Sequence, residues 1–196
     1  YLSSIGFSGT QVGLITSMGT GVAIFATLLW GRVYANSHKK RIVLIIMCLA
    51  SATLGVVSTT TTVFLVYATL YSVLYFFQGP LHGLADAFVI SKSNNFSAIR
   101  ALGAAGYAVA VFVAGRYAES YGLKGIFYMY AIAFVITAVF IMMESEPPFH
   151  KDEEKKVSIG EVFKNKKFIK LLICSFFLMG TNITNSTYFG YLFREQ

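Results

Sequence analysis

Residues 123–143 read LKGIFYMYAIAFVITAVFIMM, a run of 21 residues in which Lys124 carries the only charge. A helix rises about 1.5 Å per residue, so about 20 apolar residues cross the hydrocarbon core of a bilayer. Five further apolar runs of similar length are separated by short polar segments. The six predicted spans are 10–34, 42–58, 63–90, 98–118, 123–143 and 168–193. We therefore predict an all-α protein, a polytopic bundle of membrane-spanning helices.

The composition supports this prediction, because 56% of the 196 residues are hydrophobic and only 13% are charged. An ordinary soluble domain has about 25% charged residues. A transmembrane barrel would instead show alternating segments of about 10 residues. The observed runs are longer and apolar on most faces, which excludes a barrel.

The basic residues, which give a net charge of +7, are sorted by loop. Thirteen of them fall in the breaks on one side of the predicted membrane and three on the other. Nucleic acid binding would require a basic face, so we predict no nucleic acid partner. By the positive-inside rule the side with thirteen is cytoplasmic, and we expect a multi-pass protein of the cell inner (plasma) membrane.

The longest hydrophilic stretch, 144–167, contains Pro147 and Pro148 and lies on the predicted cytoplasmic side. We predict three parts: most of an N-terminal bundle in 1–143, a cytoplasmic linker in 144–167, and the first helix of a C-terminal bundle in 168–196. The chain begins without a methionine or a signal peptide, so we expect it to be a piece of a longer protein.

Asp86 is the only acidic residue deep within an apolar run. An unpaired charge there costs at least about 2.5 kcal/mol, so it needs a partner or a water-filled cavity. Arg100, near the start of the next predicted helix, is the nearest cation. The two could bind a polar solute together, or they could form a structural ion pair that braces two helices.

His82 lies four residues before Asp86, and Gln78 four before that, so the three share one helical stripe. We predict that His82 and Asp86 hold or pass a proton; the alternative for His82 is a hydrogen bond to a neighbouring helix. Tyr107 follows Arg100 by seven residues and shares its face. Its ring suits a sugar or an aromatic ligand, or simply packs.

The last predicted span is too polar to face lipid, and we expect its Asn182 and Asn185 to line a substrate cavity. Small residues at four-residue intervals, first Gly79 and Gly83 and then a series that begins at Gly106, predict close helix packing. Cys48 and Cys174 both fall in apolar spans, where we expect small buried side chains rather than a disulfide.

The stretch from Gly31 to Lys40 resembles the loop after the second helix in the major facilitator superfamily. Gly31 matches the first glycine of that motif, and Lys39 and Lys40 match its final basic pair. Ala35 stands where the motif has an aspartate, and His38 where it has a second glycine. The resemblance implies that Gly31, Lys39 and Lys40 belong to a loop involved in conformational switching.

A further likeness lies in Asp86, Arg100, Gly103 and Tyr107, whose order and spacing resemble those of lactose permease-like oligosaccharide and proton symporters and of phenylpropionate permease-like proteins. The likeness implies a partial major facilitator fold, helices 2 to 7 of 12, with helix 1 and helices 8 to 12 outside the chain. It also implies that Asp86, Arg100 and Tyr107 contact the substrate.

Motifs for phosphate-binding loops, metalloproteases and serine hydrolases are absent from the sequence. We therefore predict no enzyme, metal or cofactor, and an ion gradient rather than ATP as the energy source. The predicted function is secondary active transport, proton-coupled symport of a sugar or oligosaccharide. Alternatives are uptake of nucleosides or small aromatic acids, drug efflux, or a membrane receptor on the same fold.

Overall fold

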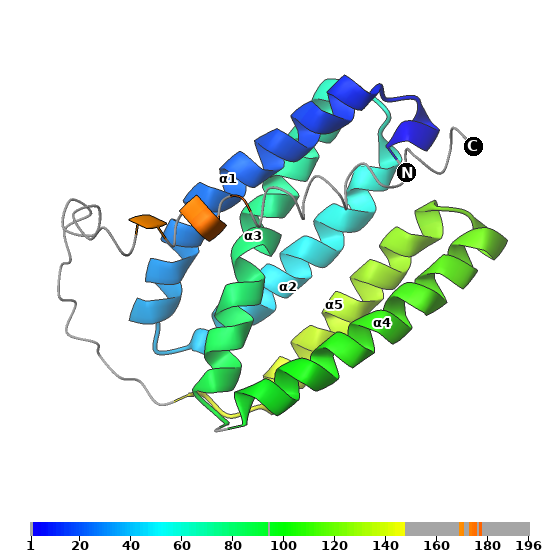
Figure 1. Ribbon diagram of the computed structural model, residues 1–196. Helices are drawn as coiled ribbons and strands as arrows, with labels where there is room; N and C mark the ends of the chain where they lie inside the picture. The colour runs from blue at the N-terminus through cyan, green and yellow to red at the C-terminus, as the bar shows by residue number, and fades with distance from the viewer. Residues whose placement is uncertain (1, 94, 148–168, 171–172, 176, 178–196) are drawn as a thin grey trace. The chain divides into compact units, whose positions relative to one another are not determined.

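The computed structural model describes residues 2–93, 95–147, 169–170, 173–175 and 177. Over these residues it contains five long helices and no strand (Figure 1): α1 (Gly9–Asn36), α2 (Lys40–Val57), α3 (Phe64–Ile90), α4 (Phe96–Tyr121) and α5 (Lys124–Met143). All five are long and apolar enough to cross a membrane. The predicted all-α membrane bundle is confirmed, and no predicted end of these five helices differs from the structure by more than three residues.

The chain divides into two compact units, Tyr1–Lys151 and Asp152–Gln196. The five long helices belong to the first unit. The sixth predicted span, 168–193, falls in the second unit, where the described residues are helical. The rest of that span lies outside the described residues, as do residues 148–167 of the predicted linker.

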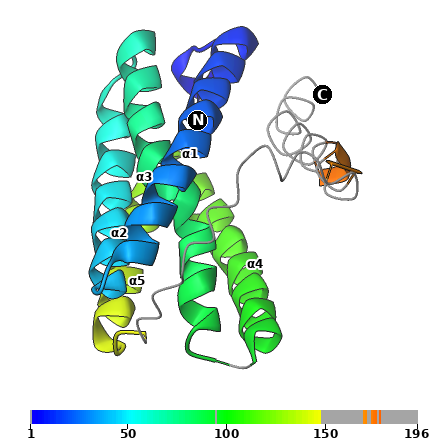
Figure 2. The same ribbon diagram turned by 90° about the vertical axis from the view of Figure 1, so that its left-hand side faces the viewer.

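Within the first unit the helices pack in an order that differs from their order along the chain. α1 lies along α3 in both views (Figures 1 and 2), and α2 packs between α3 and α5. α4 makes its main contact with α5. As a result, α3 and α4 follow each other in sequence but are joined by few contacts, which leaves room between them for a cavity.

Two clusters of buried side chains hold these helices together. The larger joins α1, α2, α3 and α5 and consists of Tyr34, Val43, Leu44, Met47, Cys48, Leu81, Phe88 and Ala138. The smaller lies at the start of α1 and α3 and consists of Phe7, Val12, Ile15, Tyr67 and Ala68. Both cysteines are free; Cys48 is buried as predicted, whereas Cys174 is exposed, which corrects that half of the prediction.

Local sequence explains where several helices begin and end. Ser8 and Gln11 form a capping box at the start of α1: the Ser8 hydroxyl accepts from the Gln11 amide at 3.3 Å, and the Gln11 side chain accepts from the Ser8 amide at 2.9 Å. α4 ends at Tyr121, and the next residue, Gly122, has a positive φ of 81° that suits glycine. This turn reverses the chain directly into α5.

Close helix packing is realised at Gly79 and not at the other predicted glycines. A Cβ added to Gly79 would lie 2.6 Å from the Cβ of Ala23, so the backbones of α3 and α1 approach closely there. A Cβ at Gly83 or Gly106 would meet nothing within 4 Å. Gly106 lies on α4, which has no buried residue in the part of the chain that the structure describes.

Substituting Gly79 by alanine should loosen the contact between α1 and α3. The new methyl group would meet Ala23, whose Cβ is fixed to the backbone, so the helices must separate, at a cost of about 1–3 kcal/mol. Gly83→Ala is the matched control, since it adds the same group to the same helix in open space. Thermal unfolding of the detergent-solubilised protein should show a lower Tm for Gly79→Ala alone. Equal Tm values for the two variants would refute the close contact.

Candidate functional site

An ion pair joins α3 to α4. Nη1 of Arg100 donates to Oδ2 of Asp86 at 3.0 Å, and the guanidinium also lies over the ring of Phe96, 5.7 Å from its centroid. The side chains are 42% exposed for Asp86 and 67% exposed for Arg100. Both groups therefore keep exposed atoms that can contact a solute.

The pair lies in a cavity of about 540 Å³ between α3 and α4. Its lining residues are His82, Asp86 and Val89 from α3, and Phe96, Ile99, Arg100, Gly103, Ala104 and Tyr107 from α4. This volume is within the usual range of about 300–1,000 Å³ for small-molecule sites. We call it the charged cavity.

Four of the residues selected from the sequence are therefore neighbours in space. His82 lies one helical turn before Asp86, and Tyr107 lies two turns after Arg100 on the same face of α4. Tyr107 is 72% exposed, and its ring lines the cavity. A carboxylate, a guanidinium, an imidazole and a phenol ring can together hold hydroxyl groups, stack on an apolar face and exchange a proton.

The other selected residues lie elsewhere. Gly31 is within α1, so of the three loop residues only Lys39 and Lys40 lie at the connection to α2. The backbone amide of Lys39 donates to the Ser37 hydroxyl at 3.1 Å, and Nζ of Lys40 lies 5.6 Å from the Tyr34 ring centroid. Asn182 and Asn185 lie outside the described residues.

Comparison with known proteins decides the family. The whole chain, residues 1–196, matches the MFS_1 like family, a group within the major facilitator superfamily. The chain belongs to this family. Membership fits the observed fold, a bundle of long apolar helices with a charged cavity between two of them.

Two relatives of this MFS_1-like chain are named as a transporter and a permease. It is 27% identical over 195 residues to an uncharacterized transporter, YwbF, of Bacillus subtilis (strain 168), and 25% identical over 193 residues to a maltose permease of Geobacillus stearothermophilus. Each alignment covers 96% of the chain but 48% and 49% of the relatives, so the chain spans about half of their length. No solved structure matches the chain significantly.

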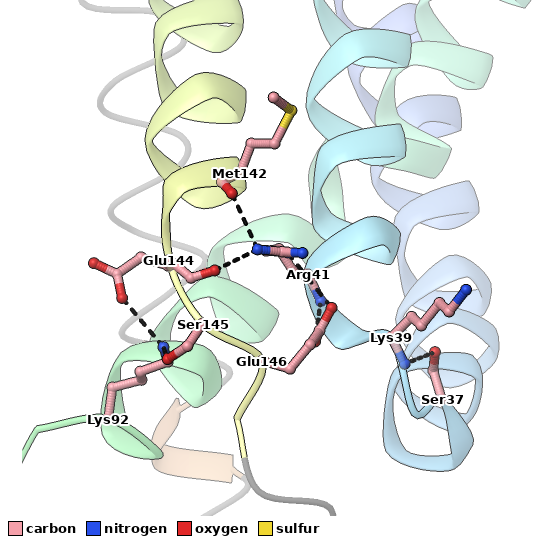
Figure 3. Close-up of polar contacts among 8 residues, drawn as sticks. All are labelled: Ser37, Lys39, Arg41, Lys92, Met142, Glu144, Ser145 and Glu146. Carbon is pink, nitrogen blue, oxygen red and sulfur yellow. Dashed lines mark hydrogen bonds and ion pairs between the residues drawn. The ribbon is translucent and has the colours of Figure 1, made fainter.

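A second polar cluster of the MFS_1-like chain, which the sequence did not predict, lies where α5 ends (Figure 3). Nη1 of Arg41 donates to the carbonyl oxygens of Met142, at 3.0 Å, and Glu144, at 2.6 Å. Glu146 in turn accepts from the backbone amide of Arg41 at 3.1 Å and lies 3.5 Å from its Nε. The start of α2 and the end of α5 thus satisfy each other's unpaired backbone groups.

Lys92, just after α3, completes this cluster. Its Nζ donates to Oε2 of Glu144 at 3.1 Å and to the Ser145 hydroxyl at 2.6 Å, and it lies 5.5 Å from the ring centroid of Phe88. We call Arg41, Lys92, Glu144, Ser145 and Glu146 the clasp. It ties the end of α3 and the start of α2 to the residues that lead out of α5.

The sequence does indicate part of the clasp, but the indication is missed when only the basic residues are considered. The acids Glu144 and Glu146 lie among basic residues on the same predicted side of the membrane, where opposite charges can pair. Which cation meets which acid depends on how α2, α3 and α5 pack. The carbonyl oxygens that Arg41 contacts become acceptors only because α5 ends there.

Removing the Arg41 side chain should destabilise the bundle, because it leaves the end of α5 and Glu146 without their cation. Each hydrogen bond to a charged group contributes about 1.5–3 kcal/mol, so Arg41→Ala should lower the Tm by several degrees. Arg32→Ala is the control, since Arg32 is exposed near the end of α1 and is outside the clasp. Equal Tm values for the two variants, measured by thermal unfolding, would show that the clasp does not hold the helices.

Proposed function

We propose that the whole protein is a secondary active transporter that takes up a sugar or oligosaccharide together with protons. The observation that carries this proposal is the Asp86–Arg100 pair, exposed to a cavity of about 540 Å³ between two membrane-spanning helices. An ionisable pair inside a membrane bundle is costly, and such groups generally mark substrate or ion pathways. Rocking of two bundles would expose the site to each side in turn.

The chemistry of the charged cavity favours a polar, hydroxylated substrate. Asp86 can accept hydrogen bonds from sugar hydroxyls while Arg100 donates to them, and charge-assisted bonds are about twice as strong as neutral ones. Tyr107 offers a ring face for the apolar side of a sugar and a hydroxyl for its edge. The similarity to a maltose permease supports the same class of substrate.

Proton coupling is assigned to His82 and Asp86. They are one helical turn apart and line the same cavity, so a proton on either group changes the charge that the substrate and Arg100 experience. A protonated Asp86 would release Arg100 to the substrate, and deprotonation would restore the ion pair. This exchange links substrate occupancy to proton movement.

The remaining assignments follow from the distribution of charge. Thirteen of the 16 basic residues lie on the side that carries 144–167, so by the positive-inside rule we assign that linker to the cytoplasm and the protein to the inner (plasma) membrane. Residues 1–143 form most of one bundle, and 168–196 contribute a helix to the second. Asn182 and Asn185 would add polar groups from that helix, and further helices of the full protein would close the site.

Replacing Asp86 by asparagine should abolish transport. Asparagine keeps the shape but loses both the charge that pairs with Arg100 and the titratable group, so uptake of labelled maltose by cells should fall by at least about a hundredfold. The control is Glu119→Gln in the exposed pair with Arg116 at the other end of α4, 3.7 Å apart, which lies outside the cavity. Normal uptake by Asp86→Asn would overturn the site.

A variant of the charged cavity should also show which class of substrate binds there. Arg100→Ala should raise the KM for maltose, because a guanidinium contact to the substrate is lost. Uptake assays of the same cells with uridine and phenylpropionate test the alternatives. Arg100-dependent uptake of either one, without uptake of maltose, would replace the sugar assignment.

A further inference from the structure

A second cavity, of about 180 Å³, lies within the bundle at the other end of α3. Its lining residues are Gly55 from α2, Tyr71, Leu74, Tyr75 and Gln78 from α3, and Ile126, Phe127 and Tyr130 from α5. None of them lines the charged cavity, and none is charged. We call this cavity the tyrosine pocket. Pockets of this type, mostly aromatic with a few polar groups, bind small ligands in many proteins.

The walls of the tyrosine pocket are aromatic rings in defined orientations. The rings of Tyr71 and Tyr75 stack with their centroids 4.6 Å apart. Tyr130, on the α5 side, lies 4.6 Å from Phe134, and the two rings are tilted by 55°. Gln78 adds an amide that can both donate and accept. The pocket therefore offers flat apolar faces with hydroxyl and amide groups at their edges.

These rings pack directly against the backbone of glycine residues in the neighbouring helices. A Cβ added to Gly19 in α1 would lie 2.8 Å from Cε1 of Tyr71 and 3.3 Å from Cγ of Tyr75. A Cβ added to Gly55 in α2 would lie 2.7 Å from Cε1 of Tyr130. Only glycine lets the rings lie this close to the neighbouring helices. The walls are thus held in place before any ligand arrives, which reduces the entropic cost of binding.

One face of α3 lines both cavities. The lining residues are Tyr71, Leu74, Tyr75 and Gln78 in the tyrosine pocket and His82, Asp86 and Val89 in the charged cavity. They follow one another at helical spacing, which places all seven within an arc of about 120°. From first to last they cover about 27 Å, close to the thickness of the hydrocarbon core. The two cavities therefore lie in succession along one face of α3.

We propose that the tyrosine pocket is a second binding subsite, which holds one neutral sugar ring on its way to or from the charged cavity. The proposal rests on the proposed transport of sugars. The pocket takes a neutral ligand because it has no charge to pair with one. It takes at most a single ring because 180 Å³ is below the usual range of about 300–1,000 Å³ for small-molecule sites and is too small for an oligosaccharide.

Tyrosine nitration of the purified full-length transporter, followed by peptide mass spectrometry, tests this proposal with methyl α-glucoside as the probe. At ten times its Kd the sugar should slow nitration of Tyr75 and Tyr130 about tenfold, because the occupied pocket shields both rings. Tyr121, which is 73% exposed at the end of α4, is the internal control and should react equally with and without sugar. Unchanged nitration of Tyr75 and Tyr130 would overturn the proposal.

The Asp86→Asn background separates this proposal from the transport site. Protection of Tyr75 should persist there, because Asp86 does not line the tyrosine pocket. Loss of protection in Asp86→Asn would mean that the tyrosines respond indirectly to the charged cavity, and the second subsite would be wrong. Protection without any sugar transport by the unmodified protein would instead refute the proposed function alone.

A variant that fills the pocket gives an independent check. Ile126→Trp places a large side chain in the cavity and should remove the protection of Tyr75. Ile132→Trp is the matched control, since Ile132 is on the same helix, 59% exposed and outside the pocket, and its protection should remain. Protection that survives in a folded Ile126→Trp protein would overturn the proposal. The nitration result on the unmodified protein decides the question if that variant does not fold.

Discussion

A carboxylate within an apolar membrane helix requires a counter-ion or water, and this requirement explains much of the arrangement around Asp86. Arg100 pairs with it from α4 at 3.0 Å, although α4 otherwise packs mainly against α5. The pair therefore bridges two helices that are separated by a cavity instead of closing the space between them. A hydrophobic contact at the same place would bring α3 and α4 together and remove the cavity. The Asp86–Arg100 ion pair and the charged cavity between α3 and α4 therefore depend on each other.

Much of the fold could be predicted from the sequence, because the bilayer sets the length of a helix and lipid requires every backbone group to be paired within it. Asp86 and Arg100 could also be selected from the sequence, because a charged side chain in an apolar membrane span needs a partner or water. The clasp around Arg41 could not be predicted, because its acceptors include carbonyl oxygens that are unpaired only because α5 ends there. The tyrosine pocket was missed because Tyr71 and Tyr130 come from helices that are distant in sequence.

The two ends of α3 differ in chemistry, and this difference suits transport. One end combines the charged cavity with the clasp, whose bonds connect three helices. The other end has stacked rings on glycine backbone and no charge. A substrate moving along this face would pass between aromatic stacking and charge-assisted hydrogen bonds.

We propose Asp86 and Arg100 as the site of proton-coupled sugar uptake, and proton movement is the decisive observation for this proposal. The measurement is the external pH of a lightly buffered, de-energised suspension of cells that express the full-length protein, recorded as maltose is added. We expect alkalinisation on addition of maltose, and none in cells that express Asp86→Asn. No pH change with the unmodified protein, when its expression is verified, would contradict proton-coupled uptake of this sugar.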